Sequence, residues 1–167
     1  MPTHLKTFIA AVLVATLGQV VPAAARSVVS AEIPRGTIVV DTSQRRLYLG
    51  LGRGKALSYR VAVGRAGKQW TGTTRIRSKH WKPAWSPTAE IIRENPGIQR
   101  VIPSMAPNNP MGVAALVRGK KQYAIHGTNR PSKIGQAVSY GCIRMRNADV
   151  ADLYKRVGRG TRVIVQR

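Results

Sequence analysis

Short apolar runs separated by turn residues dominate the chain from residue 36 onward. Two of them, GTIVVDT at 36–42 and RRLYLGL at 46–52, flank Ser43-Gln44-Arg45, a spacing that predicts a β-hairpin. The run LSYRVAVG at 57–64 alternates between apolar and polar positions, so we expect a single strand with one buried face. Further strands are predicted for four later runs: 73–79, 113–117, 122–127 and 161–167.

Two segments have helical features. Thr88 can cap a short helix that Pro96 would stop. A longer helix is predicted to begin with Asn147 as its N-cap and to end at Gly158. Its apolar residues follow the three- and four-residue spacing of one helix face: Val150, Leu153, Tyr154 and Val157.

This pattern predicts a mainly β single domain of sandwich or barrel-like type, with one main α-helix near the C-terminus packed on it. The chain is long enough for one domain with its own core. We divide it into a leader at 1–25, an N-terminal extension at 26–35 and a domain at 36–167.

The leader has the features of a cleaved secretory signal peptide. Lys6 precedes a nearly continuous apolar run from Thr7 to Val21, and Ala23-Ala24-Ala25 supplies the small residues that signal peptidase requires. An uncleaved anchor is the alternative, but Gly18 and Gln19 interrupt the run, which is shorter than the roughly 20 residues of a spanning helix. We expect export to the periplasm or cell envelope, with no stable membrane anchor after cleavage.

The chain is strongly basic, with 28 Lys and Arg against 6 Asp and Glu and a formal net charge of +22. Such a positive charge would favour binding to nucleic acid. Three features argue against that partner: the expected export, the scattered basic residues and the lack of a nucleic-acid-binding motif. Carboxylate-bearing wall peptides and anionic membrane faces are the alternatives. Much of the charge could also be simple solvated surface.

Cys142 is the only cysteine, so the chain cannot form an internal disulfide. The thiol is an inert packing group, half of an intermolecular disulfide, or a nucleophile. His126 lies 16 residues earlier at a predicted strand end, and the loop between them is punctuated by Pro131, Gly135 and Gly141. Such a loop can fold back and bring the pair together. An imidazole that accepts the thiol proton is the minimum partner of a cysteine nucleophile.

The neighbours of Cys142 suit a nucleophile. Gly141 permits a tight turn, which leaves the backbone N–H groups of Tyr140, Gly141 and Cys142 free to point toward a developing oxyanion. If Cys142 starts a strand, Arg144 shares a face with it and could hold the thiolate or a substrate carboxylate. The few histidines and carboxylates make a closed metal site implausible, and no metal or other cofactor is expected.

The segment IHGTNRPSKIGQAVSYGCIRMRNADVADLY resembles the signature of the L,D-transpeptidases with a YkuD-type catalytic domain. In that signature, a strand-end His-Gly is followed by a loop and then by Ser/Thr-x-Gly-Cys-Ile/Val-Arg-Met/Leu-x-Asn. The resemblance extends to other segments across nearly all of the chain after the leader: IVVDTSQRRLYL, AVGRAGKQWTGTTRIRSKHWKPAW, NPMGVAAL and GTRVIV.

The resemblance implies a role for each matched residue. Cys142 would attack the diaminopimelate carbonyl of a wall tetrapeptide and release D-alanine. His126 would be the general base, oriented by the carbonyl of Gly127. The amides of residues 140–142 would form the oxyanion hole, and Arg144 would support the site or the substrate. An amine from a second stem peptide, or a wall-attached lipoprotein, would then accept the acyl group.

Two positions depart from the family pattern. Many members have histidine before Gly-Cys, where this chain has Tyr140, and the exchange puts the choice of acceptor in doubt. Trp70 replaces a common proline, which concerns the local loop shape. Trp81 and Trp85 could line the substrate groove or simply anchor their loop. Ser139 matches the signature, although turn formation explains it equally well.

These features favour an exported cysteine transpeptidase of peptidoglycan. Water in place of the amine would make the enzyme an L,D-carboxypeptidase or wall-peptide hydrolase. A non-catalytic basic wall-binding module is the alternative from another class, and the presence of both His126 and Cys142 argues against it.

Overall fold

The computed structural model describes residues 26–118 and 123–167, so the predicted signal peptide lies outside the described residues. The strands and helices follow in this order: β1 (Arg26–Ser30), β2 (Ile38–Asp41), β3 (Arg46–Gly52), β4 (Lys55–Arg60), β5 (Val63–Gly64), β6 (Gly72–Trp81), α1 (Ala89–Glu94), β7 (Ala114–Arg118), β8 (Ala124–His126), a 3-10 turn (Pro131–Lys133), β9 (Ala137–Ser139), β10 (Ile143–Arg144), α2 (Asn147–Arg156) and β11 (Arg162–Gln166). The prediction of a mainly β domain with one main helix near the C-terminus is confirmed.

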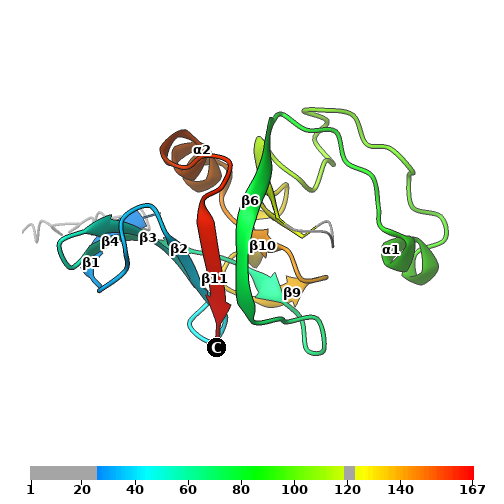
Figure 1. Ribbon diagram of the computed structural model, residues 1–167. Coiled ribbons are helices and arrows are strands. Elements are labelled where there is room, and N and C mark those ends of the chain that lie inside the picture. Colours follow the sequence, from blue (N-terminus) through cyan, green and yellow to red (C-terminus); the bar gives the residue numbers. More distant parts are fainter. Residues whose placement is uncertain (1–25, 119–122) are drawn as a thin grey trace, which may run out of the picture.

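Nine strands form one sheet in the order β1-β4-β3-β2-β11-β6-β7-β8-β10. The long strand β6 joins its two halves, because β6 pairs with β11 near its start and with β7 from Ile76 onward, with an irregularity between Ile76 and Ser78 (Figure 1). A bridge between Ala62 and Arg144 connects the region after β4 back to the far edge at β10. The sheet is thereby folded over a common core, as a sandwich or partly closed barrel requires.

The predicted hairpin is present, with β2 and β3 paired antiparallel from Ile38 opposite Leu49 to Asp41 opposite Arg46. Asp41 holds its turn, since one carboxylate oxygen accepts hydrogen bonds from the Ser43 hydroxyl at 2.7 Å and the Gln44 amide at 2.8 Å. These contacts lower the pKa of Asp41 despite the opposing effect of its burial.

One expectation about the first half of the chain was wrong. The run 57–64 divides into β4, which pairs with β1 and β3, and β5, which pairs in parallel with β9. The expected alternation of buried and exposed residues also fails in β4, because Ser58 is only 1% exposed and accepts a hydrogen bond from Arg46 at 3.0 Å. Within the N-terminal extension, β1 forms the sheet edge against β4.

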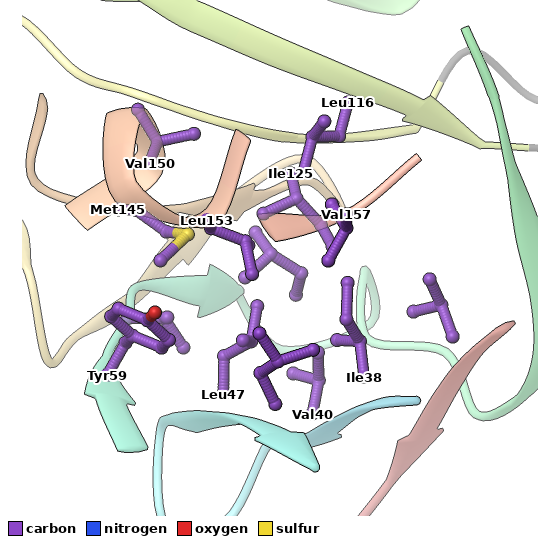
Figure 2. Packing of buried hydrophobic residues seen from close by; sticks show 14 of the residues in the cluster. Ile38, Val40, Leu47, Tyr59, Leu116, Ile125, Met145, Val150, Leu153 and Val157 are labelled. Atoms are coloured by element: carbon purple, nitrogen blue, oxygen red, sulfur yellow. The ribbon is translucent and has the colours of Figure 1, made fainter. Parts of the chain in front are cut away.

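Helix α2 packs its apolar stripe on the sheet, and Figure 2 shows Leu153 and Val157 among side chains from the strands. Val150 belongs to the same buried cluster. Leu153 is fully buried, so its truncation to alanine would cost about 2–5 kcal/mol. The ammonium group of Lys79 in β6 binds the C-terminal end of the helix, because it donates hydrogen bonds to the carbonyls of Tyr154 at 2.7 Å and Val157 at 2.6 Å.

The predicted start of this helix was wrong by one residue. Arg146 occupies the N-cap position, and the Asn147 side chain accepts hydrogen bonds from two other backbone segments instead. At the other end, Val157 is the C-cap and its N–H donates to the carbonyl of Leu153, so Gly158 is the first residue after the cap. Among the described residues, no helix has the length and apolar character needed to cross a membrane.

Candidate active site

The parallel pairing of β8 and β10 brings the predicted catalytic residues together. His126 is the last residue of β8, and Cys142 immediately precedes β10. Ile143 lies opposite Ile125 and Arg144 opposite His126, while the Met145 amide donates to the His126 carbonyl at 2.8 Å. The loop from 127 to 142 therefore returns the chain to the strand that ends in histidine, as the glycines and proline in that loop allowed.

Cys142 and His126 line one cavity of about 550 Å³, whose wall also includes Tyr140, Arg144 and Trp85. One side of the cavity is formed by α1 and the residues before it, which belong to the arm that extends away from the sheet (Figure 1). Trp81, the other predicted groove residue, is not part of this wall. Its ring is tilted against Tyr154 of α2, with the ring centroids 5.5 Å apart.

Cys142 is half-buried in the wall of the cavity. Burial raises the pKa of the thiol above its ordinary value, because the thiolate loses its hydration. The backbone of Ala124 and the guanidinium groups of Arg118 and Arg144 act in the opposite direction and favour the thiolate. The thiol is thus uncharged at neutral pH but surrounded by groups that stabilise its anion.

His126 is 4% exposed, and burial lowers its pKa to about 4. The nearby charge of Arg144 lowers this pKa further, whereas the backbones of Gly127 and Pro110 favour the protonated ring. Among the described residues, Nδ1 has no hydrogen-bond partner with good geometry. The His126 imidazole is therefore neutral, which is the protonation state that a general base requires. The orientation of the His126 ring by the Gly127 carbonyl stays a prediction.

The turn before Cys142 is fixed by a small set of hydrogen bonds. The Ser139 hydroxyl donates to the Cys142 carbonyl at 2.5 Å and accepts from the Gly141 amide at 3.0 Å. Gly141 has a φ of +111°, a conformation that favours glycine. The Gly141 amide was expected to be free for an oxyanion, and that expectation is wrong here because Ser139 occupies it. No hydrogen bond among the described residues uses the amides of Tyr140 or Cys142.

Tyr140 connects this turn to α1 on the other side of the cavity. Its phenol donates a hydrogen bond to Glu94, and Arg65 forms an ion pair with the same carboxylate at 2.6 Å. The Arg65 guanidinium also lies 4.4 Å from the centre of the Tyr140 ring. A second ion pair joins Lys68 to Glu90 of the same helix. Helix α1 buries none of its own residues, and these polar contacts connect it to Tyr140 and to the loop that holds Arg65 and Lys68.

Asn147 holds the backbone close to His126 in the sequence, two residues after it. Its side-chain oxygen accepts hydrogen bonds from the Thr128 amide at 3.0 Å and the Val113 amide at 3.4 Å. A Cβ at Gly127 would lie 2.3 Å from this oxygen, and one at Gly112 would lie 2.1 Å from it. Both positions therefore require glycine, and the asparagine joins α2 to the chain on both sides of the β7–β8 pair.

Several of these contacts were not predicted from the sequence. Glu94 belongs to a segment that was assigned only a helical role. Asn147 matches the last position of the signature, but it was assigned only a capping role. Trp70 was noted as a departure from the family pattern, and the structure gives it a contact, since its indole N–H donates to the Gly141 carbonyl at 3.1 Å. Within the described residues, no three His, Cys, Asp or Glu side chains are grouped so that they could hold a metal ion.

Comparison with known proteins agrees with this geometry. Residues 35–165 match the YkuD family, the L,D-transpeptidase catalytic domain. The probable L,D-transpeptidase YbiS of Escherichia coli K12 is 38% identical over 134 residues, which are 75% of this chain and 43% of YbiS. The putative L,D-transpeptidase YkuD of Bacillus licheniformis is 38% identical over 130 residues, which are 75% of this chain and 76% of that protein.

The fold is also that of solved L,D-transpeptidases. The crystal structure of L,D-transpeptidase 3 from Mycobacterium tuberculosis superposes with a TM-score of 0.64 at 17% identity, over 78% of this chain and 60% of that one. At that identity the likeness concerns the fold alone. The chain spans less than half the length of YbiS, its relative from E. coli.

Proposed function

Because the chain belongs to the YkuD family of L,D-transpeptidase catalytic domains, we propose that it is a cysteine transpeptidase that acts on the tetrapeptide stems of peptidoglycan. The observation that carries this proposal is the shared cavity of Cys142 and His126, because Cys142 is the only thiol in the chain. A thiol and a neutral imidazole in one cavity are the minimum equipment for acyl transfer through a thioester.

In the first half of the reaction, the Cys142 sulfur attacks the diaminopimelate carbonyl that is linked to the terminal D-alanine. His126 takes the thiol proton as the carbon–sulfur bond forms, and the carbonyl oxygen becomes an oxyanion. Collapse of this intermediate breaks the bond to D-alanine, whose nitrogen takes the proton from His126. The products are free D-alanine and a thioester on Cys142.

In the second half, an amine attacks the thioester carbonyl and gives a proton to His126. The carbon–sulfur bond then breaks, and the leaving sulfur recovers its proton. The acceptor is the side-chain amine of a second stem peptide, which creates a 3-3 cross-link, or an amine of a wall-attached protein. Water in the same position would give a trimmed tripeptide and an L,D-carboxypeptidase activity.

The positive charge of Arg144 in the cavity can stabilise the negative charge that these steps create. Arg144 lies opposite His126 in the strand pairing and lines the same cavity, where it can stabilise the thiolate or a substrate carboxylate. The amides of Tyr140 and Cys142 are the donors that we assign to the oxyanion, while the Gly141 amide holds Ser139 and shapes the turn.

We place the reaction in the periplasm or cell envelope, where the proposed substrate is found. The support for this is the apolar run of the first 25 residues, which has the length and small-residue end of a cleaved signal. The net charge of +22 would favour attraction to the anionic wall.

The test is to incubate the purified protein without its first 25 residues with disaccharide tetrapeptides and to follow the products by mass spectrometry. We expect loss of D-alanine together with cross-linked dimers. Loss of D-alanine without dimers would assign the carboxypeptidase instead, and unchanged substrate at high enzyme concentration would contradict both activities.

Two controls tie the result to Cys142. The Cys142→Ala variant should release no D-alanine, and full turnover in that variant would remove Cys142 from the mechanism. A carbapenem offers a strained acyl group to a thiolate, so it should add its mass to the wild type and not to Cys142→Ala. A wild type that forms no adduct would argue against an accessible, activated thiol.

A further inference from the structure

Arg118 is a buried cation at the end of β7 that the reaction scheme leaves unused. It is only 3% exposed, and its Nε has no hydrogen-bond partner among the described residues. Its backbone amide donates to the Tyr123 carbonyl at 2.9 Å, which fixes it across from the start of β8. A guanidinium in such a place loses most of its hydration and needs another source of stabilisation.

Two aromatic rings supply part of that stabilisation. The guanidinium carbon lies 3.6 Å from the centre of the Trp70 ring and 5.5 Å from that of Tyr123. The two rings stack with an interplanar angle of 9° and centroids 5.9 Å apart. A desolvated guanidinium over the face of tryptophan is a favourable cation–π arrangement.

Within residues 26–118 and 123–167, no carboxylate forms an ion pair with Arg118. Among the described residues, the ion pairs of acidic side chains all use other cations: Arg26, Arg65, Lys68 and Arg156. Burial lowers the pKa of Arg118 to about 10, which leaves the group protonated at neutral pH. A buried positive charge without a counter-ion stabilises any anion that forms beside it.

The anion that can form there is the thiolate of Cys142. Trp70 donates its indole N–H to the Gly141 carbonyl at 3.1 Å, and a Cβ on Gly141 would lie 2.8 Å from the Tyr123 ring. Both rings that hold Arg118 therefore touch the residue next to the nucleophile. Tyr123 also lines the cavity of Cys142, and the charges of Arg118 and Cys142 interact favourably.

We propose that Arg118 is a positioning residue for Cys142, to whose thiol it supplies a fixed positive charge. The rings of Trp70 and Tyr123 stabilise the Arg118 guanidinium, and the same two rings hold the Gly141–Cys142 turn. Arg118 is too buried to touch substrate, so it acts through the sulfur. The proposal rests on the proposed function for its effect on turnover, but its effect on the thiol can be measured without any substrate.

The experiment is the pH dependence of Cys142 alkylation by iodoacetamide, followed by intact mass from about pH 6 to about pH 10. Because Cys142 is the only cysteine, the adduct reports this thiol alone. Below the thiol pKa, the alkylation rate follows the thiolate fraction, and each unit of increase in the pKa lowers that rate about tenfold. We expect Arg118→Met and Arg118→Gln to react about threefold to tenfold more slowly at pH 8, with the rate profile displaced to higher pH.

Two further variants separate charge from shape. Arg118→Lys keeps the charge and should restore most of the rate, which a merely structural role would not do. Arg159→Met removes an exposed arginine in the turn before β11 and should leave the profile unchanged. Trp70→Phe keeps a ring for Arg118 but loses the bond to Gly141, so its thiol should titrate normally while D-alanine release slows.

The proposal is overturned if folded Arg118→Met or Arg118→Gln, checked by circular dichroism, gives the wild-type profile. It is also overturned if Arg118→Lys reacts as slowly as Arg118→Gln, or if Arg159→Met produces the same displacement. A wild type that alkylates as expected but never releases D-alanine would contradict the proposed function and leave the result for Arg118 standing.

Discussion

Cys142 and His126 line one cavity, and burial shifts the pKa values of their side chains in opposite directions. The thiol pKa is raised and the imidazole pKa is lowered to about 4, so both groups are uncharged at neutral pH. Arg144 favours the thiolate but disfavours the imidazolium. The resting site therefore holds a neutral thiol and a neutral base, and the proton moves only as the sulfur attacks.

The pH dependence of turnover follows from this resting state. We expect kcat/KM for D-alanine release to stay level between about pH 6 and about pH 8, because neither group changes its protonation there. The acid limb should lie near pH 4, where His126 gains its proton. Rates in overlapping buffers, with circular dichroism at each pH, measure this profile. An acid limb centred near about pH 6.5 would instead show an ordinary histidine.

A second prediction concerns the contact between Tyr140 and Glu94, which joins the catalytic turn to α1. Tyr140→Phe keeps the ring against Arg65 but removes the hydrogen bond. Because α1 buries none of its own residues, we expect faster amide exchange in 89–94 and a higher KM, with little change in the melting temperature.

The matched control for that variant is Tyr48→Phe, which removes an exposed phenol that donates to Gln44 at 2.8 Å on another part of the sheet. It should change neither KM nor the exchange of α1. If Tyr140→Phe altered kcat alone and left exchange in 89–94 unchanged, the phenol would act on the chemistry and not on the position of the helix.

A third prediction concerns Asn147, which accepts two backbone hydrogen bonds close to His126. Asn147→Ala should lower the free energy of unfolding by about 1–3 kcal/mol, since it leaves two amides without their acceptor. Turnover should fall as well, because the Thr128 amide lies just beyond His126. Asn147→Asp retains the acceptor oxygens and should recover most of both losses in denaturant titration and D-alanine release. Equal losses in both variants would contradict the role of the oxygen.

The parts of the fold that could be predicted are those whose residues carry a local pattern. The hairpin of β2 and β3 has two apolar runs and a turn of fixed length, and α2 has a regular apolar stripe. The loop between His126 and Cys142 is rich in turn residues and can bring the pair together, and the resemblance to the L,D-transpeptidase signature made that meeting the expectation. Each of these features depends on neighbours in the sequence.

The rest depends on contacts between distant segments. β1 has exposed residues almost throughout and so lacks an apolar alternation, and its pairing with β4 becomes evident only in the sheet. The Gly141 amide looked available because nothing in SYGC shows that the Ser139 hydroxyl turns back to it. Arg118 looked like one more basic residue beside a lysine pair, since burial against Trp70 leaves no trace in its own segment.

A last prediction concerns Asp149, a carboxylate in the first turn of α2 that is only 1% exposed. Burial raises its pKa to about 6, above the value of about 3.9 expected in the unfolded chain. Between these values the Asp149 carboxyl binds more protons in the folded state, so its own contribution to the free energy of unfolding should fall by about 2–3 kcal/mol as the pH rises from about 4 to about 7. His126, whose pKa burial lowers to about 4, acts in the opposite direction over the same range. The effect of Asp149 is therefore measured as the difference between wild type and Asp149→Asn, which should grow in favour of the variant by that amount between denaturant titrations at the two pH values. Asp41→Asn is the control of opposite sign, because hydrogen bonds lower the pKa of Asp41 and its removal should destabilise the fold at neutral pH. A wild type as stable at pH 7 as the Asp149→Asn variant would contradict a buried, unfavourably charged carboxylate.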